Sequence, residues 1–235
     1  MEESEDFRTR CVGGGLEGKR SGAARGVFAL EGGVQAGAME GKARMMAQRR
    51  AGVRPAGQSA GATRMDFSFT CTACGEVHHG LPSFGADAPA TYYAVPPEER
   101  DRRCDLGSDD CVIDEQHFYV RGCIELPIAG YPEPFVWGVW VSLSLQSYET
   151  WVRMSDEPKR SHTPPLFGWL TTRLDPYPDT IGLKTHVHLR DDGIRPYIEL
   201  EATSHPLAIE QREGITTGRV AQIYALLVHG QAGPG

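Results

Sequence analysis

The sequence has no apolar run that approaches the roughly 20 residues needed to span a membrane, and its N-terminus lacks the apolar core of a secretion signal. It also has no glycine-rich loop that cradles phosphates and no nucleophile elbow. These absences argue against a membrane protein, a secreted protein and two common classes of enzyme. We therefore expect a cytoplasmic protein, in which thiols stay reduced and clustered cysteines are more often metal ligands or reactive groups than disulfides.

Basic residues are scarce in most of the chain. The 235 residues contain 24 Lys and Arg against 31 Asp and Glu, a net charge of −7. Residues 1–64 hold 11 of the basic and 7 of the acidic residues, which leaves 13 basic and 24 acidic residues, a net charge of −11, for residues 65–235. Because an acidic body repels phosphate backbones, we expect no nucleic-acid binding by this part, and the partner is an unknown protein or small molecule.

Aromatic residues are scarce in residues 1–64, which contain only Phe7 and Phe28 among repeated Gly, Ala and Arg dipeptides. So few large apolar side chains cannot offset the entropy lost when a chain becomes ordered. We therefore expect residues 1–64 to be a disordered Gly/Ala/Arg-rich leader, and we set aside Cys11, which lies in it.

Two other interpretations of the leader stay open. A glycine- and arginine-rich arm can contact nucleic acid. Alternatively, translation starts at Met65, directly before the first foldable pattern, and the leader is a mis-called upstream stretch; we favour this second interpretation. Either way, we expect residues 65–235 to form a single globular domain.

Apolar periodicity in residues 65–235 predicts an α+β domain. Alternation in His117–Leu126 places Phe118 and Val120 on one face of a strand. Residues 135–141 are apolar on both faces, so we place them in the middle of the sheet. Residues 216–229 carry an apolar stripe at helical spacing. The expected fold is a mainly antiparallel sheet packed with a C-terminal helix, with a small zinc-knuckle-like element at the N-terminus.

The pair Asp192-Gly193 predicts a hairpin between residues 184–190 and 195–201, because such a pair tolerates the positive backbone angles of a tight turn. In that register the numbers of opposite residues sum to 385, which pairs His186 with Glu199, Lys184 with Glu201 and His188 with Tyr197. Charge pairing across the strands then satisfies the basic side chains. The alternative is a metal site at the two histidines, which share one face of their strand.

Cys71 and Cys74 give the clearest chemical signal. Two cysteines separated by two residues can place both thiolates on one tetrahedral ion, and Gly75 gives the backbone freedom to turn. The pair is half a site, and the candidates for the other half are His78, His79, Cys104 and Cys111. We predict a structural zinc held by Cys71, Cys74, His78 and Cys111, and the alternative is an unmetallated pair of small buried residues. A redox pair is disfavoured because Gly75, Gly80 and Pro82 interrupt the helix that it needs.

A competing hypothesis is a hydrolase-type enzyme with a site near Arg121, Asp109, Asp114 and His205. The arginine can bind an anion, the acids can chelate magnesium or form a turn, and the histidine can act with Glu210 or cap a helix. Convergence of these residues on one pocket would favour the enzyme. Their dispersal, with a clustered cysteine pair and two more ligands, would favour our first hypothesis, a binding or interaction module.

Eight motifs in order carry a family resemblance. They are Phe69-x-Cys71-x-x-Cys74-Gly75-x-x-His78, Ser108-Asp109-x-Cys111-Val112-Ile113-Asp114, Phe118-x-x-Arg121-Gly122, Trp137-Gly138-Val139-Trp140-Val141-Ser142-Leu143, Phe167-Gly168-Trp169-Leu170, Tyr177-Pro178-x-Thr180, Arg195-Pro196 and His205-Pro206-Leu207-Ala208. Together they resemble a bacterial family of uncharacterised proteins, domain of unknown function 2199, over Asp66 to His229. The resemblance implies a domain boundary that leaves the leader out, and it implies no activity.

Overall fold

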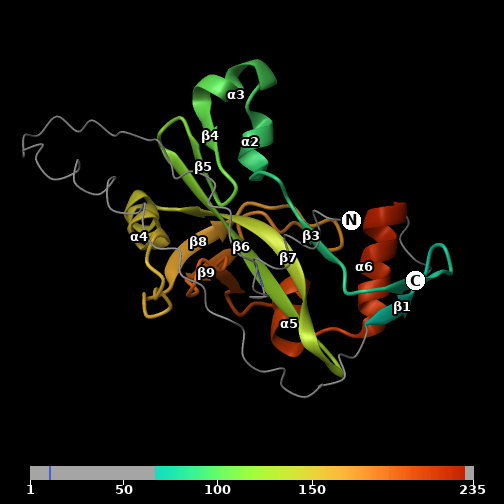
Figure 1. The fold of residues 1–235 in the computed structure, drawn as a ribbon. Coiled ribbons are helices and arrows are strands. Elements are labelled where there is room, and N and C mark those ends of the chain that lie inside the picture. Colours follow the sequence, from blue (N-terminus) through green and yellow to red (C-terminus); the bar gives the residue numbers. More distant parts are fainter. Residues whose placement is uncertain (1–10, 12–66, 231–235) are drawn as a thin grey trace, which may run out of the picture. The chain divides into compact units, whose positions relative to one another are not determined.

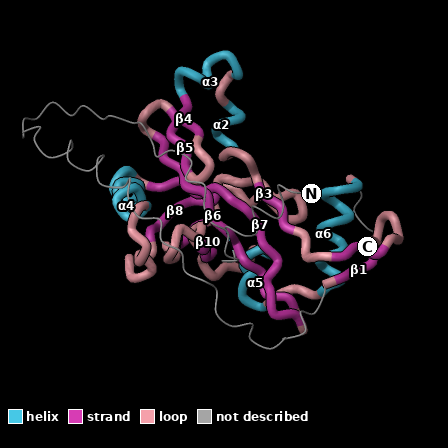
Figure 2. The backbone as a smooth tube through the Cα atoms, viewed as in Figure 1, coloured by secondary structure: helices cyan, strands magenta, loops and turns pink. Residues whose placement is uncertain are grey.

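The centre of the fold is a long β-hairpin formed by strands β6 and β7. The computed structural model describes Cys11 and residues 67–230, whose elements are shown in Figures 1 and 2. Strand β6 (His117–Ile128) pairs antiparallel with β7 (Tyr131–Leu143), so that Val120 lies opposite Val141. The alternation of side chains puts both valines in the main core. Residues 135–141 of β7 are buried on both faces, as predicted for a central strand.

Five strands close into a ring. Strand β7 pairs with β8 (Leu166–Leu170), β8 with β9 (Lys184–His188), and β9 with β10 (Tyr197–Leu200), all antiparallel. Strand β10 then returns to β6 through a parallel bridge between Tyr197 and Cys123. The α+β fold with a mainly antiparallel sheet is thus confirmed, while the closure of its strands into a small barrel is a feature that the sequence pattern did not predict.

Gly122 in β6 permits this closure. The N–H of the next residue, Cys123, donates to the carbonyl oxygen of Pro196 at 2.9 Å. A Cβ atom at position 122 would lie 2.9 Å from that same oxygen and still closer to the side chain of Ile198. Strand β10 can therefore approach β6 only because residue 122 has no side chain.

Three short strands extend the sheet beyond the barrel. Strand β3 (Ser83–Gly85) lies parallel to β7, β5 (Asp110–Ile113) lies antiparallel to β6, and β4 (Cys104–Leu106) lies antiparallel to β5. Helices α2 (Ala90–Ala94) and α3 (Pro97–Arg103) connect β3 to β4, and they stand beside β4 and β5 in Figure 1. Helix α3 begins with a proline, whose missing N–H costs nothing at that position.

Three longer helices, α4 (Leu145–Ser155), α5 (Pro206–Glu213) and α6 (Thr217–His229), complete the described part. Each begins where a side chain accepts a hydrogen bond from a backbone N–H of the first turn, and the capping residues are Ser144, His205 and Thr216. The apolar stripe of α6 is buried through Val220, Ala221, Ile223 and Ala225. Helix α6 packs against β1, the first strand of the described chain, as Figure 1 shows. The predicted C-terminal helix is confirmed.

The β9–β10 hairpin has the predicted register. Tyr197 lies opposite His188 and Glu199 lies opposite His186, so paired residue numbers sum to 385. The predicted pair of Lys184 and Glu201 is present, with Nζ and Oε2 3.4 Å apart. His188 instead pairs diagonally, because its Nε2 lies 2.8 Å from Glu199 Oε2. The ring of His186 instead lies edge-on to that of Phe167, a residue of β8. The two histidines therefore have separate partners and do not form a metal site with each other.

Cys11 requires a correction, because the structure bonds it to Cys123 in a disulfide. Both residues are fully buried, and they form a small apolar cluster with Val136. A cysteine that the sequence analysis set aside is thus a structural partner of the barrel, and these two thiols are not reduced. The expected leader, residues 1–64, otherwise lies outside the described residues.

Candidate metal centre

The two-cysteine knuckle is the turn of a small hairpin. Strands β1 (Ser68–Thr70) and β2 (Val77–His79) pair antiparallel, and Phe69 lies opposite His78. Each strand has only three residues, so the hairpin cannot bury enough surface to be stable alone. Its apolar side chains must pack against another element, and that element is α6.

Backbone hydrogen bonds shape the turn. The N–H of Gly75 donates to the carbonyl oxygen of Cys71 at 3.0 Å, and the N–H of Cys71 donates to the carbonyl oxygen of Glu76 at 2.8 Å. Gly75 has a φ angle of +74°, which glycine adopts without steric cost. The chain therefore reverses within the spacing of the two cysteines, and both thiols face the same side.

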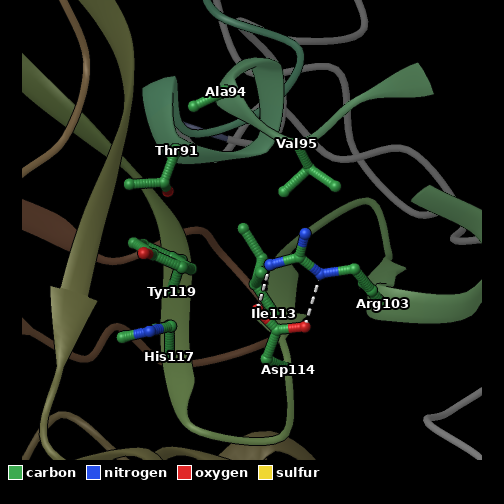
Figure 3. Close-up of a pocket in the computed structure, with 8 residues that line it drawn as sticks. All are labelled: Thr91, Ala94, Val95, Arg103, Ile113, Asp114, His117 and Tyr119. Carbon is green, nitrogen blue, oxygen red and sulfur yellow. Dashed lines mark hydrogen bonds and ion pairs between the residues drawn. The ribbon is translucent and has the colours of Figure 1, made fainter. Parts of the chain in front are cut away.

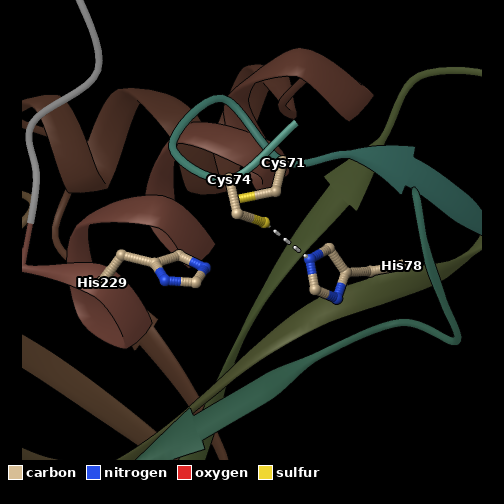
Figure 4. Close-up of side chains that lie close together, drawn as sticks. All are labelled: Cys71, Cys74, His78 and His229. Carbon is tan, nitrogen blue, oxygen red and sulfur yellow. Dashed lines mark hydrogen bonds between the residues drawn. The ribbon is translucent and has the colours of Figure 1, made fainter. Parts of the chain in front are cut away.

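Four side chains converge beside this turn (Figure 4). The sulfur atoms of Cys71 and Cys74 and ring nitrogens of His78 and His229 all lie within 4.8 Å of one another. The Sγ atom of Cys74 is 3.5 Å from Nε2 of His78. Figure 4 shows the two imidazoles reaching the cysteines from β2 and from the end of α6. These four residues can hold a metal ion.

The electrostatics at Cys71 favour its metal-binding form. This residue is buried, whereas Cys74 and His229 are exposed. Desolvation raises the pKa of the Cys71 thiol, but hydrogen bonds from the backbone N–H groups of Cys74 and Ala73 oppose it, and the net pKa is lowered. Because the thiolate is the form that binds metals, the turn prepares its buried cysteine for ligation.

Aromatic packing orients the two histidines. The His78 ring stacks on Phe69, with centroids 5.4 Å apart, and it lies 4.6 Å from the ring of Tyr224 in α6. Tyr224 is also 6.0 Å from the ring of His229, which is the last residue of α6. One tyrosine therefore contacts both imidazoles, so the packing of α6 also positions the rings of His78 and His229.

His229 is the site residue that the sequence analysis missed. Its only local signal is its position as the last helical residue before Gly230, which ends α6 in the left-handed conformation with a φ angle of +64°. A histidine there is common for helical reasons alone, because a cation suits a helix C-terminus. Only the packing of α6 against β1 brings it to the knuckle.

The other candidate ligands lie elsewhere. Cys111, in β5, does not join the group of four; it is fully buried in a cluster with Tyr119 and Trp140. Desolvation raises the pKa of its thiol to about 12, so the thiol is neutral. Cys104 packs against the same cluster, and His79 is exposed on the other face of β2. His229, and not Cys111, completes the group of four. Cys111 is remote because β5 belongs to the large sheet, whereas the knuckle packs on α6.

The residues of the hydrolase hypothesis make contacts in several parts of the fold. The contacts are Asp109 with Arg195 (2.7 Å), Asp114 with Arg103 (2.7 Å), Arg121 over the ring of Trp140 (5.7 Å), and His205 with the N–H of Leu207 (3.2 Å). Of these four, Asp114 is the one that lines a pocket between α2 and β5. The N–H of Arg121 also donates to the carbonyl oxygen of Asp109 at 2.8 Å, so these two residues are neighbours. Asp114 pairs with Arg103 and His205 caps α5, so the four side chains do not line one pocket together.

A family model matches residues 70–215, which is more than half of the chain. The family is described as uncharacterised protein conserved in bacteria, domain of unknown function 2199. The chain belongs to this family. The matched segment includes Cys71, Cys74 and His78, whereas His229 lies beyond its end. Neither the curated proteins nor the solved structures contain a match to the chain.

Membrane insertion has no candidate element in the described part of the chain. None of the helices between residues 67 and 230 combines the length and the apolar composition that crossing a bilayer requires.

Proposed function

We propose that this protein is a binding or interaction module whose N-terminal knuckle is held by one structural zinc ion. The ligands are Cys71, Cys74, His78 and His229. The observation that carries the proposal is that these four ligand atoms, from the first hairpin and the last helix of the described chain, lie within 4.8 Å of one another.

The donor set and its spacing fit zinc. Bonds of about 2.3 Å to sulfur and about 2.0 Å to nitrogen put the ligand atoms of a tetrahedron roughly 3.3 to 3.8 Å apart. The separation of 3.5 Å between Cys74 Sγ and His78 Nε2 agrees with this geometry. Two thiolates and two imidazoles also suit zinc better than magnesium or calcium, which prefer oxygen ligands.

The number of ligands supports a structural rather than a catalytic role. Structural zinc sites are closed by four protein ligands, whereas catalytic sites keep one position for water or substrate. Here four protein side chains are already grouped. Such an ion fastens β1–β2 to the end of α6, and its binding free energy becomes folding free energy for a hairpin too short to be stable alone.

The proposal places the protein in the cytoplasm. Among the described residues Cys71, Cys74, Cys104 and Cys111 are free thiols, which supports a reducing compartment. The Cys11–Cys123 disulfide is the exception. Fractionation of cells that express the full chain tests the location, because recovery of the protein outside the cytoplasmic fraction would contradict it.

Elemental analysis of the full chain, purified without added metal, tests the zinc proposal. We expect about one zinc per chain, and loss of most of it in His229→Ala and Cys74→Ser. The matched control is His186→Ala, a histidine that lies against Phe167 on the barrel and keeps the zinc. A zinc-free full chain whose melting temperature is unchanged by a chelator would refute the proposal.

Substitution by cobalt gives a second measurement. Cobalt(II) takes the same tetrahedral positions, and its absorption spectrum reports how many thiolates it contacts. We expect a two-thiolate spectrum in the full chain and a one-thiolate spectrum in Cys74→Ser. An octahedral spectrum in the full chain would contradict the closed ligand set.

A further inference from the structure

A pocket of about 290 Å³ opens between α2 and the turn that joins β5 to β6 (Figure 3). It is lined by Thr91, Ala94, Val95, Arg103, Ile113, Asp114, His117 and Tyr119. Its volume is close to the lower limit of small-molecule sites, roughly 300 Å³. All of its lining residues fall inside the segment that the family model matches.

The floor of the pocket is apolar and the mouth is exposed. Val95, Ile113 and Tyr119 are 6%, 3% and 4% exposed, so they form a fixed surface at the bottom. Thr91 and Ala94 are exposed and belong to α2. In Figure 3 their side chains face Tyr119 and Ile113 across the pocket. A ligand can therefore enter from solvent and place an apolar group on the floor.

The polar wall is an ion pair. Arg103 donates from Nε to Oδ1 of Asp114 at 2.7 Å and from Nη2 to Oδ2 at 2.5 Å. Its third nitrogen, Nη1, donates to Glu99 at 2.7 Å. Asp114 in the lining and Glu99 beside it thus share one guanidinium, and this group of three side chains carries a net negative charge. Arg102 adds little compensation, because it is largely exposed and lies 3.8 Å from Glu99.

The backbone of this wall is strained. Asp114 and Glu115 have φ angles of 52° and 55°, in the left-handed region that residues other than glycine rarely adopt. The N–H of Asp114 donates to the carbonyl oxygen of Arg103 at 2.8 Å, so backbone and side-chain bonds together hold the carboxylate at the pocket. Strain of this kind concentrates at ligand sites.

We propose that this pocket binds a small molecule that joins a positively charged amine to an apolar group. The amine meets the Asp114 carboxylate, and the apolar group rests on Val95 and Ile113. An anion fits less well, because Arg103 is already shared between two acids. The net charge of −11 on residues 65–235 also favours the approach of cations. The inference names a ligand class for the binding role proposed above, and it does not depend on the zinc ion.

Three probes with the same phenyl ring test the sign of the charge. The full chain, labelled with ¹⁵N, is titrated with phenethylamine, 3-phenylpropionate and 2-phenylethanol, and backbone amide shifts are followed by NMR. We expect phenethylamine to shift the amides of Thr91, Ile113 and Tyr119 with a Kd in the millimolar range, as suits so small a ligand. The other two probes bind at least about tenfold more weakly. Equal shifts for all three, tighter binding of the carboxylate, or no shifts at these residues would each overturn the proposal.

Variants show whether the shifts come from this pocket. Ala94→Trp fills the mouth and abolishes the shifts, whereas Ala90→Trp, an exposed position on the same helix outside the lining, leaves them unchanged. Asp114→Asn keeps the turn, because asparagine tolerates the left-handed conformation, and it removes the preference for the amine. Undiminished binding in Ala94→Trp contradicts the assignment. Zinc content is measured on the same samples, so a failure of the metal proposal is seen separately.

Discussion

The ring of His78 stacks on the ring of Phe69, its partner across the β1–β2 ladder, with centroids 5.4 Å apart and planes inclined by 24°. Phe69 is 5% exposed and belongs to the main core, so the candidate ligand His78 packs directly on a core side chain. The same contact therefore orients the His78 ring and packs the hairpin.

Phe69→Ala tests this coupling. Removing a buried phenylalanine side chain costs about 3 to 5 kcal/mol of unfolding free energy. We expect a loss in this range by urea denaturation, together with weaker zinc retention in a chelator competition. Phe167→Ala is the control, because that ring is 46% exposed and its removal changes stability by no more than about 0.5 kcal/mol. Full zinc retention in Phe69→Ala would show that the stacking does not position the ligand.

Gly122→Ala tests the closure of the barrel. A methyl group at this position meets Ile198 and the carbonyl oxygen of Pro196, so β10 must move away from β6. We expect a loss of about 1 to 3 kcal/mol in unfolding free energy, measured by denaturant titration. The matched control is Gly218→Ala in α6, where the nearest atom to a new Cβ is 3.6 Å away. Alanine there raises stability by about 0.5 to 1 kcal/mol, and a similar gain at position 122 would contradict the closed ring.

Glu115→Gly tests the strain in the β5–β6 turn. Glu115 is exposed and has a φ angle of 55°. Relief of the left-handed conformation raises the unfolding free energy by about 1 to 2 kcal/mol. The greater freedom of glycine in the unfolded chain lowers it by about 0.4 to 1 kcal/mol. We expect a net rise of about 1 kcal/mol in unfolding free energy. Glu115→Ala removes the same carboxylate but keeps the strain, so a gain of equal size in that variant would point to charge instead.

Asp191→Asn tests the acid sensitivity of the loop before β10. Hydrogen bonds from the backbone N–H groups of Ser161 and Arg160 lower the pKa of the Asp191 carboxyl well below its ordinary value of 3.8. A lowered pKa means that the folded state favours the charged form. This contribution is fully present above the unfolded pKa and is lost as the pH falls through the folded one.

We therefore expect Asp191→Asn to be less stable than the natural chain at neutral pH. Below about pH 4 the difference in melting temperature should shrink, because the natural carboxyl then takes up its proton on unfolding. Asp192→Asn is the control, since that neighbouring acid is largely exposed. A difference that stays constant down to pH 2 would show that Asp191 acts through shape and not through its charge.

Much of the fold follows from local patterns. Alternation placed Phe118 and Val120 on one face of β6, and both lie in the main core. The Asp192-Gly193 turn predicted the register of β9 against β10, because a tight turn allows few offsets. The spacing of Cys71 and Cys74, with a glycine after them, located the candidate metal-binding turn for the same reason. These features depend on neighbours in sequence, so the sequence is sufficient to predict them.

The sequence by itself therefore determined the α+β class, the strands over His117–Leu126 and 135–141, the knuckle and three of the four grouped side chains. Tertiary structure alone decided that His229 and not Cys111 is the fourth side chain of the group, that β10 returns to β6, and that Cys11 meets Cys123. Each of these contacts joins segments far apart along the chain. No local period encodes such a contact, because it arises only when apolar faces such as those of α6 and β1 are buried against each other and the whole core has found its packing.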